Sequence, residues 1–181
     1  MNISVQQREF SLRSEYEIST PGCIYLAEKK FFSWRDKIKL MGPRDQIMAR
    51  IIGRFSLFRS KYDLELTDGR TYHFWKQKIW KGVFLCEGSN ESFTLYEHKG
   101  LNYSIFQNNS QIAAFNKNRL RIGNGDRYEI RMNDDANLIV VICLALVVDA
   151  SENEGDPASV TYDFGNIGPQ DRPFDRSWEP S

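Results

Sequence analysis

Basic and aromatic side chains stand together in the segment WKQKIWKG, residues 75–82. Indole rings favour the head-group depth of a membrane, and each cation near an anionic leaflet contributes about 1 kcal/mol. A second short basic pattern, Lys-x-Arg, stands at 117–119. A solvated strand face is the competing interpretation of both segments. The candidates for contact with a lipid or another anion are Trp75, Lys76, Lys78, Trp80, Lys81, Lys117 and Arg119.

Residue patterns for catalysis are absent from the sequence. No GxSxG, Walker loop or GxGxxG occurs. Cys23, Cys86 and Cys143 show no CxxC spacing, and His73 and His98 show no zinc-site spacing, so surface positions are expected for both histidines. We therefore expect a protein that is not an enzyme and that needs no cofactor or metal.

The charges balance overall but are divided unevenly along the chain. Residues 1–150 hold 22 basic and 17 acidic side chains, whereas residues 151–181 hold two and seven. An excess of about five positive charges is small for nucleic-acid binding, and the acidic segment could mask it. Because the first residues form no apolar signal region, a cytoplasmic location, with contact to a membrane periphery, is expected.

Alternation of apolar and polar residues runs from Phe10 to Met132, interrupted by short turn clusters, as in antiparallel β proteins. The pair Asp68-Gly69 suits a two-residue hairpin turn between 62–67 and 71–75. A further hairpin is expected to join 119–122 to 127–132, with Arg121 opposite Glu129.

The run LIVVICLALVV at 138–148 is apolar throughout. Its length favours a helix over about 136–149, with residues 133–135 supplying N-caps. Such a helix would be about 20 Å long, too short to span a bilayer. Because it is apolar on every side and the rest of the chain reads as strand, a sheet closed around a central helix is expected.

This order of elements resembles the tubby C-terminal-like superfamily, in particular its LURP-one-related and phospholipid-scramblase branches. The segments that carry the resemblance, which extends over about residues 8–150, are YDLELTDGRTYHF, NYSIFQNNSQIAAFNK and RYEIRMNDDANLIVVICLALVVDA. It implies a mostly β fold, a closed antiparallel barrel of about twelve strands around a C-terminal hydrophobic helix. It also implies that Lys117 and Arg119 match the Lys-x-Arg pattern with which tubby domains contact phosphoinositide head groups.

The expected organisation is a barrel over residues 1–150, with its helix at 136–149, and an acidic, proline-containing tail over 151–181. The tail aromatics Tyr162, Phe164, Phe174 and Trp178 could anchor it to the barrel or to a partner. The expected function is a non-enzymatic module that binds anionic phospholipid head groups or a protein partner. The alternative is a scramblase-like lipid-handling protein, or an enzyme, with an interior or rim pocket. The sequence leaves the oligomeric state open.

Overall fold

In a computed structural model of the whole chain, the structure describes residues 1–10, 13–30, 36–54, 61–78, 82–118, 126–152 and 172–181. Within them lie strands, one short 3-10 helix and one α-helix. In chain order the elements are β1 (Asn2–Phe10), β2 (Arg13–Ser19), β3 (Ile24–Lys30), β4 (Asp36–Met41), η1 (Pro43–Asp45), β5 (Ile47–Arg54), β6 (Lys61–Leu66), β7 (Thr71–Lys78), β8 (Val83–Gly88), β9 (Ser92–His98), β10 (Asn102–Gln107), β11 (Ser110–Asn118), β12 (Arg127–Met132) and α1 (Leu138–Glu152).

The strands form one closed antiparallel barrel in which each strand pairs with its neighbours in sequence. β1 and β12 close the ring, with Asn2 opposite Arg131 and Gln6 opposite Arg127. The expected mostly β barrel of twelve strands with a C-terminal helix is confirmed. A hairpin that joins β6 to β7 is confirmed as well, but the predicted two-residue turn is wrong, because Leu66 pairs with Arg70 and leaves Thr67, Asp68 and Gly69 between them. Gly69 takes a φ of 91° in this turn.

The predicted pairing of Arg121 with Glu129 is wrong. β11 is longer than expected and itself pairs with β12, so that Asn116 stands opposite Glu129. This register places Phe115 opposite Ile130, and both face the core. Arg121 lies outside the described residues.

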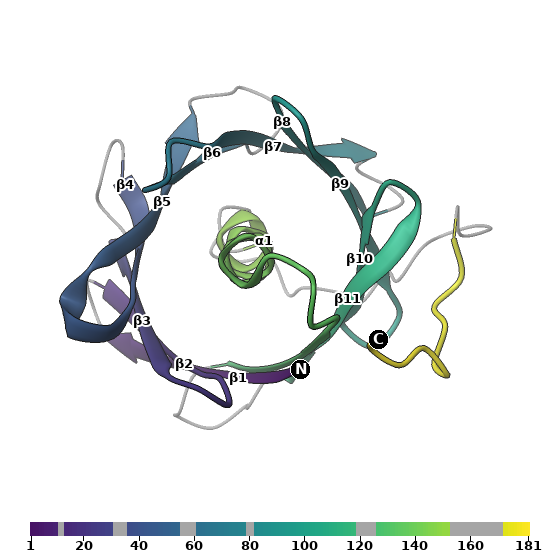
Figure 1. Cartoon of the computed structure of the whole chain (residues 1–181), viewed down its shortest axis with the longest axis horizontal. Helices are drawn as coiled ribbons and strands as arrows, with labels where there is room; N and C mark the ends of the chain where they lie inside the picture. Colours follow the sequence, from purple (N-terminus) through teal and green to yellow (C-terminus); the bar gives the residue numbers. More distant parts are fainter. Residues whose placement is uncertain (11–12, 31–35, 55–60, 79–81, 119–125, 153–171) are drawn as a thin grey trace.

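The helix α1 lies in the middle of the ring of strands (Figure 1). Each residue from Val140 to Val148 is buried, so the helix is covered on all sides, as its composition requires. A barrel of twelve strands is wider than the eight-stranded barrels whose interior side chains alone can fill. The helix supplies the missing core.

The helix begins at Leu138 and its N-cap is Asn137, whose Oδ1 accepts the backbone N–H of Val140 at 3.2 Å. The prediction that residues 133–135 cap the helix is therefore wrong by two to four positions. No helix among the described residues is long and apolar enough to cross a membrane.

Because neighbouring strands are antiparallel, odd-numbered strands end and even-numbered strands begin at the same end of the barrel. The helix also ends there, because its residue Asp149 contacts Lys29 near the end of β3 and Lys117 near the end of β11. We call this the Asp149 end. Residues 172–181 lie outside the ring, beside β10 and β11 (Figure 1).

Candidate functional site

An ionic cluster occupies the barrel interior at the Asp149 end. The Asp149 carboxylate is fully buried and accepts hydrogen bonds from Lys117 Nζ at 2.7 Å, from the Tyr16 hydroxyl at 2.6 Å and from the Tyr128 hydroxyl. Lys29 Nζ lies 3.5 Å from the same carboxylate. The helix thereby becomes attached to β2, β3, β11 and β12.

Lys117 also joins a second carboxylate, Asp126, across a distance of 3.1 Å. The cluster therefore holds two lysines and two aspartates, and their formal charges cancel. Burial raises the pKa of the Asp149 carboxyl, but Lys117 and Lys29 outweigh it and hold that pKa well below its usual range. Burial and the neighbouring Asp149 carboxylate raise the pKa of Tyr128, so its hydroxyl stays a hydrogen-bond donor.

The cluster fastens the helix to the strands. Each carboxylate oxygen of Asp149 accepts a tyrosine hydroxyl, and Lys117 is held between two aspartates. The sequence analysis missed Asp149, Lys29, Tyr16 and Tyr128. The one local signal was an aspartate that follows directly on an apolar helix run.

The structure places Lys117 in this interior cluster, with only 1% of its surface exposed. The sequence analysis expected Lys117 on an outer surface facing an anion. The position is inward because Lys117 shares a face of β11 with Ala113 and Phe115, which belong to the core. In this structure its ammonium faces Asp149 and Asp126.

The other candidates belong to two parts of the chain. Trp75 and Lys76 are half-buried on β7, and they point to opposite faces of the strand because they are adjacent. Lys76 Nζ lies 5.1 Å from the ring centroid of Phe84. Lys78 is the last residue of β7, at the Asp149 end. Trp80, Lys81 and Arg119 lie outside the described residues.

The two histidines differ in position. His73 is exposed, as expected, and its Nδ1 lies 2.7 Å from Asp63 Oδ1. The expectation of a surface position is wrong for His98, which is 2% exposed. Its Nε2 bonds Ser104 Oγ at 2.7 Å, and Phe174 from the tail lies over its ring.

Basic residues gather at the Asp149 end of the barrel. We compared the two residues of each strand that lie nearest this end. The acidic ones are Glu9, Asp36 and Glu97. The basic ones are Arg13, Lys29, Lys30, Lys37, Arg54, Lys61, Lys78, Lys117 and Arg127. At the opposite end the same strand positions hold one basic residue, Arg131, and two acidic ones, Glu65 and Glu87. Positive charge is thus concentrated at the Asp149 end of the barrel.

Most of these basic positions lie on neighbouring strands. We use the term basic rim for the set on β2, β3, β5, β6 and β7, namely Arg13, Lys30, Arg54, Lys61 and Lys78. Arg13, Lys30, Arg54 and Lys61 are exposed. Arg13 forms an ion pair with Glu15 at 3.1 Å, and Arg54 forms one with Asp63. Both carboxylates lie two residues further from the Asp149 end than their arginine partners.

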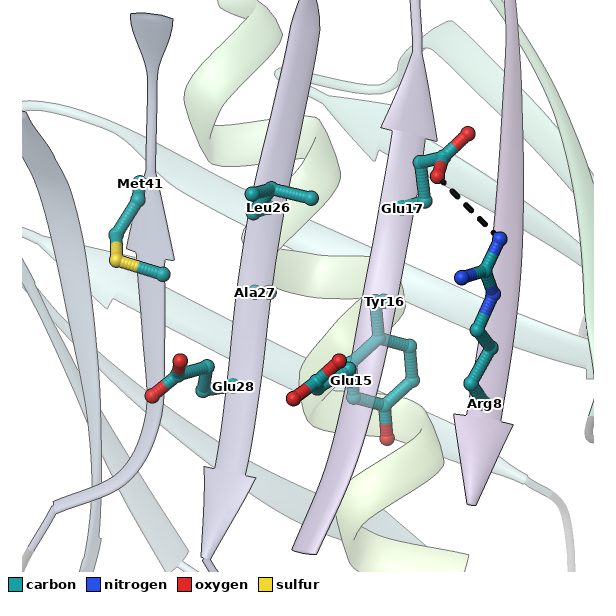
Figure 2. Close-up of a pocket in the computed structure, with 8 residues that line it drawn as sticks. All are labelled: Arg8, Glu15, Tyr16, Glu17, Leu26, Ala27, Glu28 and Met41. Atoms are coloured by element: carbon teal, nitrogen blue, oxygen red, sulfur yellow. Dashed lines mark ion pairs between the residues drawn. The ribbon is translucent and has the colours of Figure 1, made fainter. Parts of the chain in front are cut away.

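A hollow of about 240 Å³ lies on the outer face of β1–β4. Figure 2 shows Glu15 and Glu28 side by side on its wall, with Leu26 and Met41 beyond them. Glu17 and Arg8 face each other across the neighbouring strands, 3.7 Å apart. Because three glutamates stand against one arginine, this hollow disfavours an anionic ligand.

Comparison with known families identifies this architecture. The family model described as LURP-one-related matches residues 1–149, nearly all of the barrel and its helix. The chain therefore belongs to the LURP-one-related family, and its closed twelve-stranded barrel is consistent with the tubby-like fold. Searches of curated proteins and of solved structures found no match.

Proposed function

We propose that this protein is a non-enzymatic binding module that contacts an anionic phospholipid surface through the basic rim. On this proposal the protein works in the cytoplasm and touches the membrane from its periphery. The observation that carries it is the concentration of exposed cations at one end of the barrel. At the opposite end the same strand positions hold one basic residue, Arg131.

The filled interior supports a surface function over a pocket function. Every residue of α1 from Val140 to Val148 is buried against the strands, and Asp149 closes the end of the helix with its ionic cluster. A scramblase-like protein or an enzyme would need a cavity for a lipid or substrate beside the helix. The hollow described above lies on the outer face of β1–β4.

The geometry of the basic rim suits a flat charged surface. Strands β2 to β7 are neighbours in the ring, so their ends present Arg13, Lys30, Arg54, Lys61 and Lys78 along one arc. A membrane touching this arc meets several cations at once. At about 1 kcal/mol for each cation near an anionic leaflet, a few of them suffice for reversible binding.

Vesicle co-sedimentation tests this proposal. We expect the protein to bind vesicles that contain phosphatidylserine or a phosphoinositide, and not vesicles of phosphatidylcholine alone. Binding should fall with rising salt, because the Debye length contracts from about 10 Å at 0.1 M to about 3 Å at 1 M.

A matched pair of charge-reversal variants locates the surface. The variant Lys30→Glu/Lys61→Glu/Lys78→Glu removes cations from the basic rim, and Arg44→Glu/Arg50→Glu/Arg131→Glu makes the same charge change elsewhere on the barrel. The first should lose vesicle binding without a lower melting temperature, and the second should keep most of it. Equal binding by both variants, or none by the unmodified protein at low salt, would overturn the proposal.

A further inference from the structure

Two strands of the barrel are buried on both faces. In β2 and β12 buried residues alternate with more exposed ones, whereas Tyr103–Phe106 in β10 and residues 112–115 in β11 are buried without interruption. Tyr103 and Ile105 face the core, so Ser104 and Phe106 face outward. An outward-facing phenylalanine that is only 9% exposed requires a cover.

The described cover is the segment 172–181. The guanidinium of Arg172 lies 4.1 Å from the ring centroid of Phe106 and 5.8 Å from that of Tyr96. These two rings meet edge to face, with centroids 5.5 Å apart. Arg172 also donates to Asn109, from Nη2 to Oδ1 at 3.0 Å and from Nη1 to the backbone oxygen at 3.4 Å. The Arg172 guanidinium thus contacts two aromatic rings and two oxygens.

The receiving groups stand on rigid structure. Asn109 has a φ of 71° and follows Asn108, with a φ of 48°, in the two-residue turn that joins β10 to β11. Consecutive positive φ values of this kind define the tight hairpin turn that matches strand twist. The turn therefore fixes the backbone of Asn109 beside the strand that carries Phe106.

Phe174 occupies a second position, two residues further along. Its ring lies over His98, with centroids 5.0 Å apart, and His98 is fixed by its bond to Ser104. Pro173 between them is exposed, because in an extended segment alternate side chains face the same way. Pro173 also fixes its own φ and favours an extended conformation at Arg172.

We propose that the outer face of β9–β11 is a binding site for an extended peptide with the pattern Arg-x-Phe, presented by a partner protein. On this proposal residues 172–181 of the chain are the occupant in cis, and a partner segment of the same chemistry replaces them. We call this surface the Arg-x-Phe site, formed by Tyr96, His98, Phe106 and Asn109. The proposal is independent of membrane contact through the basic rim.

The contacts on this surface suit an exchangeable occupant. Pro173, Asp175, Arg176, Ser177 and Glu179 are exposed, and outside the Arg-x-Phe site the segment is held at its end, where Ser181 donates its backbone N–H to Asn133 Oδ1 at 3.1 Å and accepts the backbone N–H of Asp134 at 3.1 Å. A cation over aromatic rings is a modest interaction at a surface. The contacts of Ser181 keep Arg172 and Phe174 near the Arg-x-Phe site, so a free peptide must compete with an attached segment.

Peptide binding to the full chain tests the proposal. The variant Arg172→Ala/Phe174→Ala weakens the cis contacts and leaves the Arg-x-Phe site intact. The probe is a labelled, N-acetylated peptide of residues 172–181, RPFDRSWEPS, followed by fluorescence anisotropy. We expect saturable binding to this variant, at least tenfold tighter than to the unmodified protein, where the cis segment competes.

Control substitutions in the peptide and in the protein locate the contact. The same peptide with alanine at its first position should bind at least tenfold more weakly. In the Arg172→Ala/Phe174→Ala background, Asn109→Gly should weaken binding severalfold, because glycine tolerates the positive φ and only the amide acceptor is lost. Phe106→Ala in that background should abolish binding, with the melting temperature recorded to show that the barrel is folded.

Four results would overturn the proposal, and the first three concern peptide binding. They are no peptide binding to the Arg172→Ala/Phe174→Ala variant, binding that is insensitive to the peptide arginine, and binding that survives both Asn109→Gly and Phe106→Ala. A fourth is a concentration-dependent dimer of the unmodified protein that Arg172→Ala/Phe174→Ala abolishes, which would make a second copy of the chain the occupant.

Discussion

Asp149 stands in the last turn of α1, where the negative end of the helix dipole opposes a carboxylate. It is also fully buried, which by itself favours the neutral acid. Lys117 and Lys29 reverse both effects by placing two cations beside the carboxylate. The charge of Asp149 is therefore stable only because strands from distant parts of the chain bring the lysines to it.

Replacing Asp149 alone should be costly. Asp149→Asn removes the charge that balances Lys117 and Lys29, and breaking a buried ion pair in this way costs about 3–5 kcal/mol of unfolding free energy. Lys117→Met/Asp149→Asn removes one charge of each sign, so the net charge of the cluster is unchanged. Urea unfolding should show that the double variant is more stable than the sum of the two single changes implies. Additive losses would show that the pair is not coupled.

Stability should also depend on pH through this carboxylate. The pKa of Asp149 is lowered on folding from an unfolded value of about 3.9. Its contribution is therefore fully present above the unfolded pKa and is lost as the pH falls below it. Urea unfolding at several pH values between 7 and 3 should give a steeper acid loss for the unmodified protein than for Lys117→Met/Asp149→Asn. Parallel curves would contradict the assigned pKa shift.

At the scale of elements, α1 replaces the ligand or solvent that could fill a wide barrel. Its apolar run packs against inward residues from around the ring, among them Ile18, Leu64, Leu95 and Ile130. The barrel and the helix therefore form one core.

Leu144 lies near the middle of that core, so Leu144→Lys should prevent folding. A lysine there has no carboxylate to meet, and a buried unpaired charge costs several kcal/mol, comparable with the stability of a small domain. The matched control is Asp135→Lys, in the exposed turn before the helix. Circular dichroism should show a cooperative melt for the control and none for Leu144→Lys. A melt at the unmodified temperature in Leu144→Lys would place the helix outside the core.

The sequence predicted the elements better than the contacts between them. Alternation and the eleven-residue apolar run were enough to predict strands closed around a helix, because burial pattern is a local property. The pairing of Glu129 was missed because β11 extends further than its hydrophobic pattern. Lys117 was placed on the surface because its partners Asp149 and Asp126 come from other elements. The sequence did contain one signal for an inward position. Lys117 stands two residues after Phe115 on the same strand, so both side chains face the same way.

At the scale of the whole molecule, the structure separates three outer regions. The basic rim lies at the Asp149 end, the glutamate-lined hollow lies on β1–β4, and the segment 172–181 covers β9–β11. The near-zero net charge of the chain conceals this arrangement. A membrane contact that uses the basic rim would hold the barrel by one end and leave the other two regions accessible.

Site-specific labelling can show which end of the barrel faces a membrane. Cys86 and Cys143 are buried, and burial raises the pKa of the Cys143 thiol to about 12, so neither should react in the folded protein. Cys23→Ser removes the partly exposed thiol. Single cysteines can then be placed at Lys61, on the basic rim, and at Asn90, in a turn at the opposite end.

The most direct test is the fluorescence of a polarity-sensitive dye at each position, recorded while phosphatidylserine vesicles are added. We predict a blue shift and increased intensity for the dye at residue 61, reversed by high salt, and no change at residue 90. Equal changes at both positions, or a change at residue 90 alone, would contradict membrane contact through the basic rim.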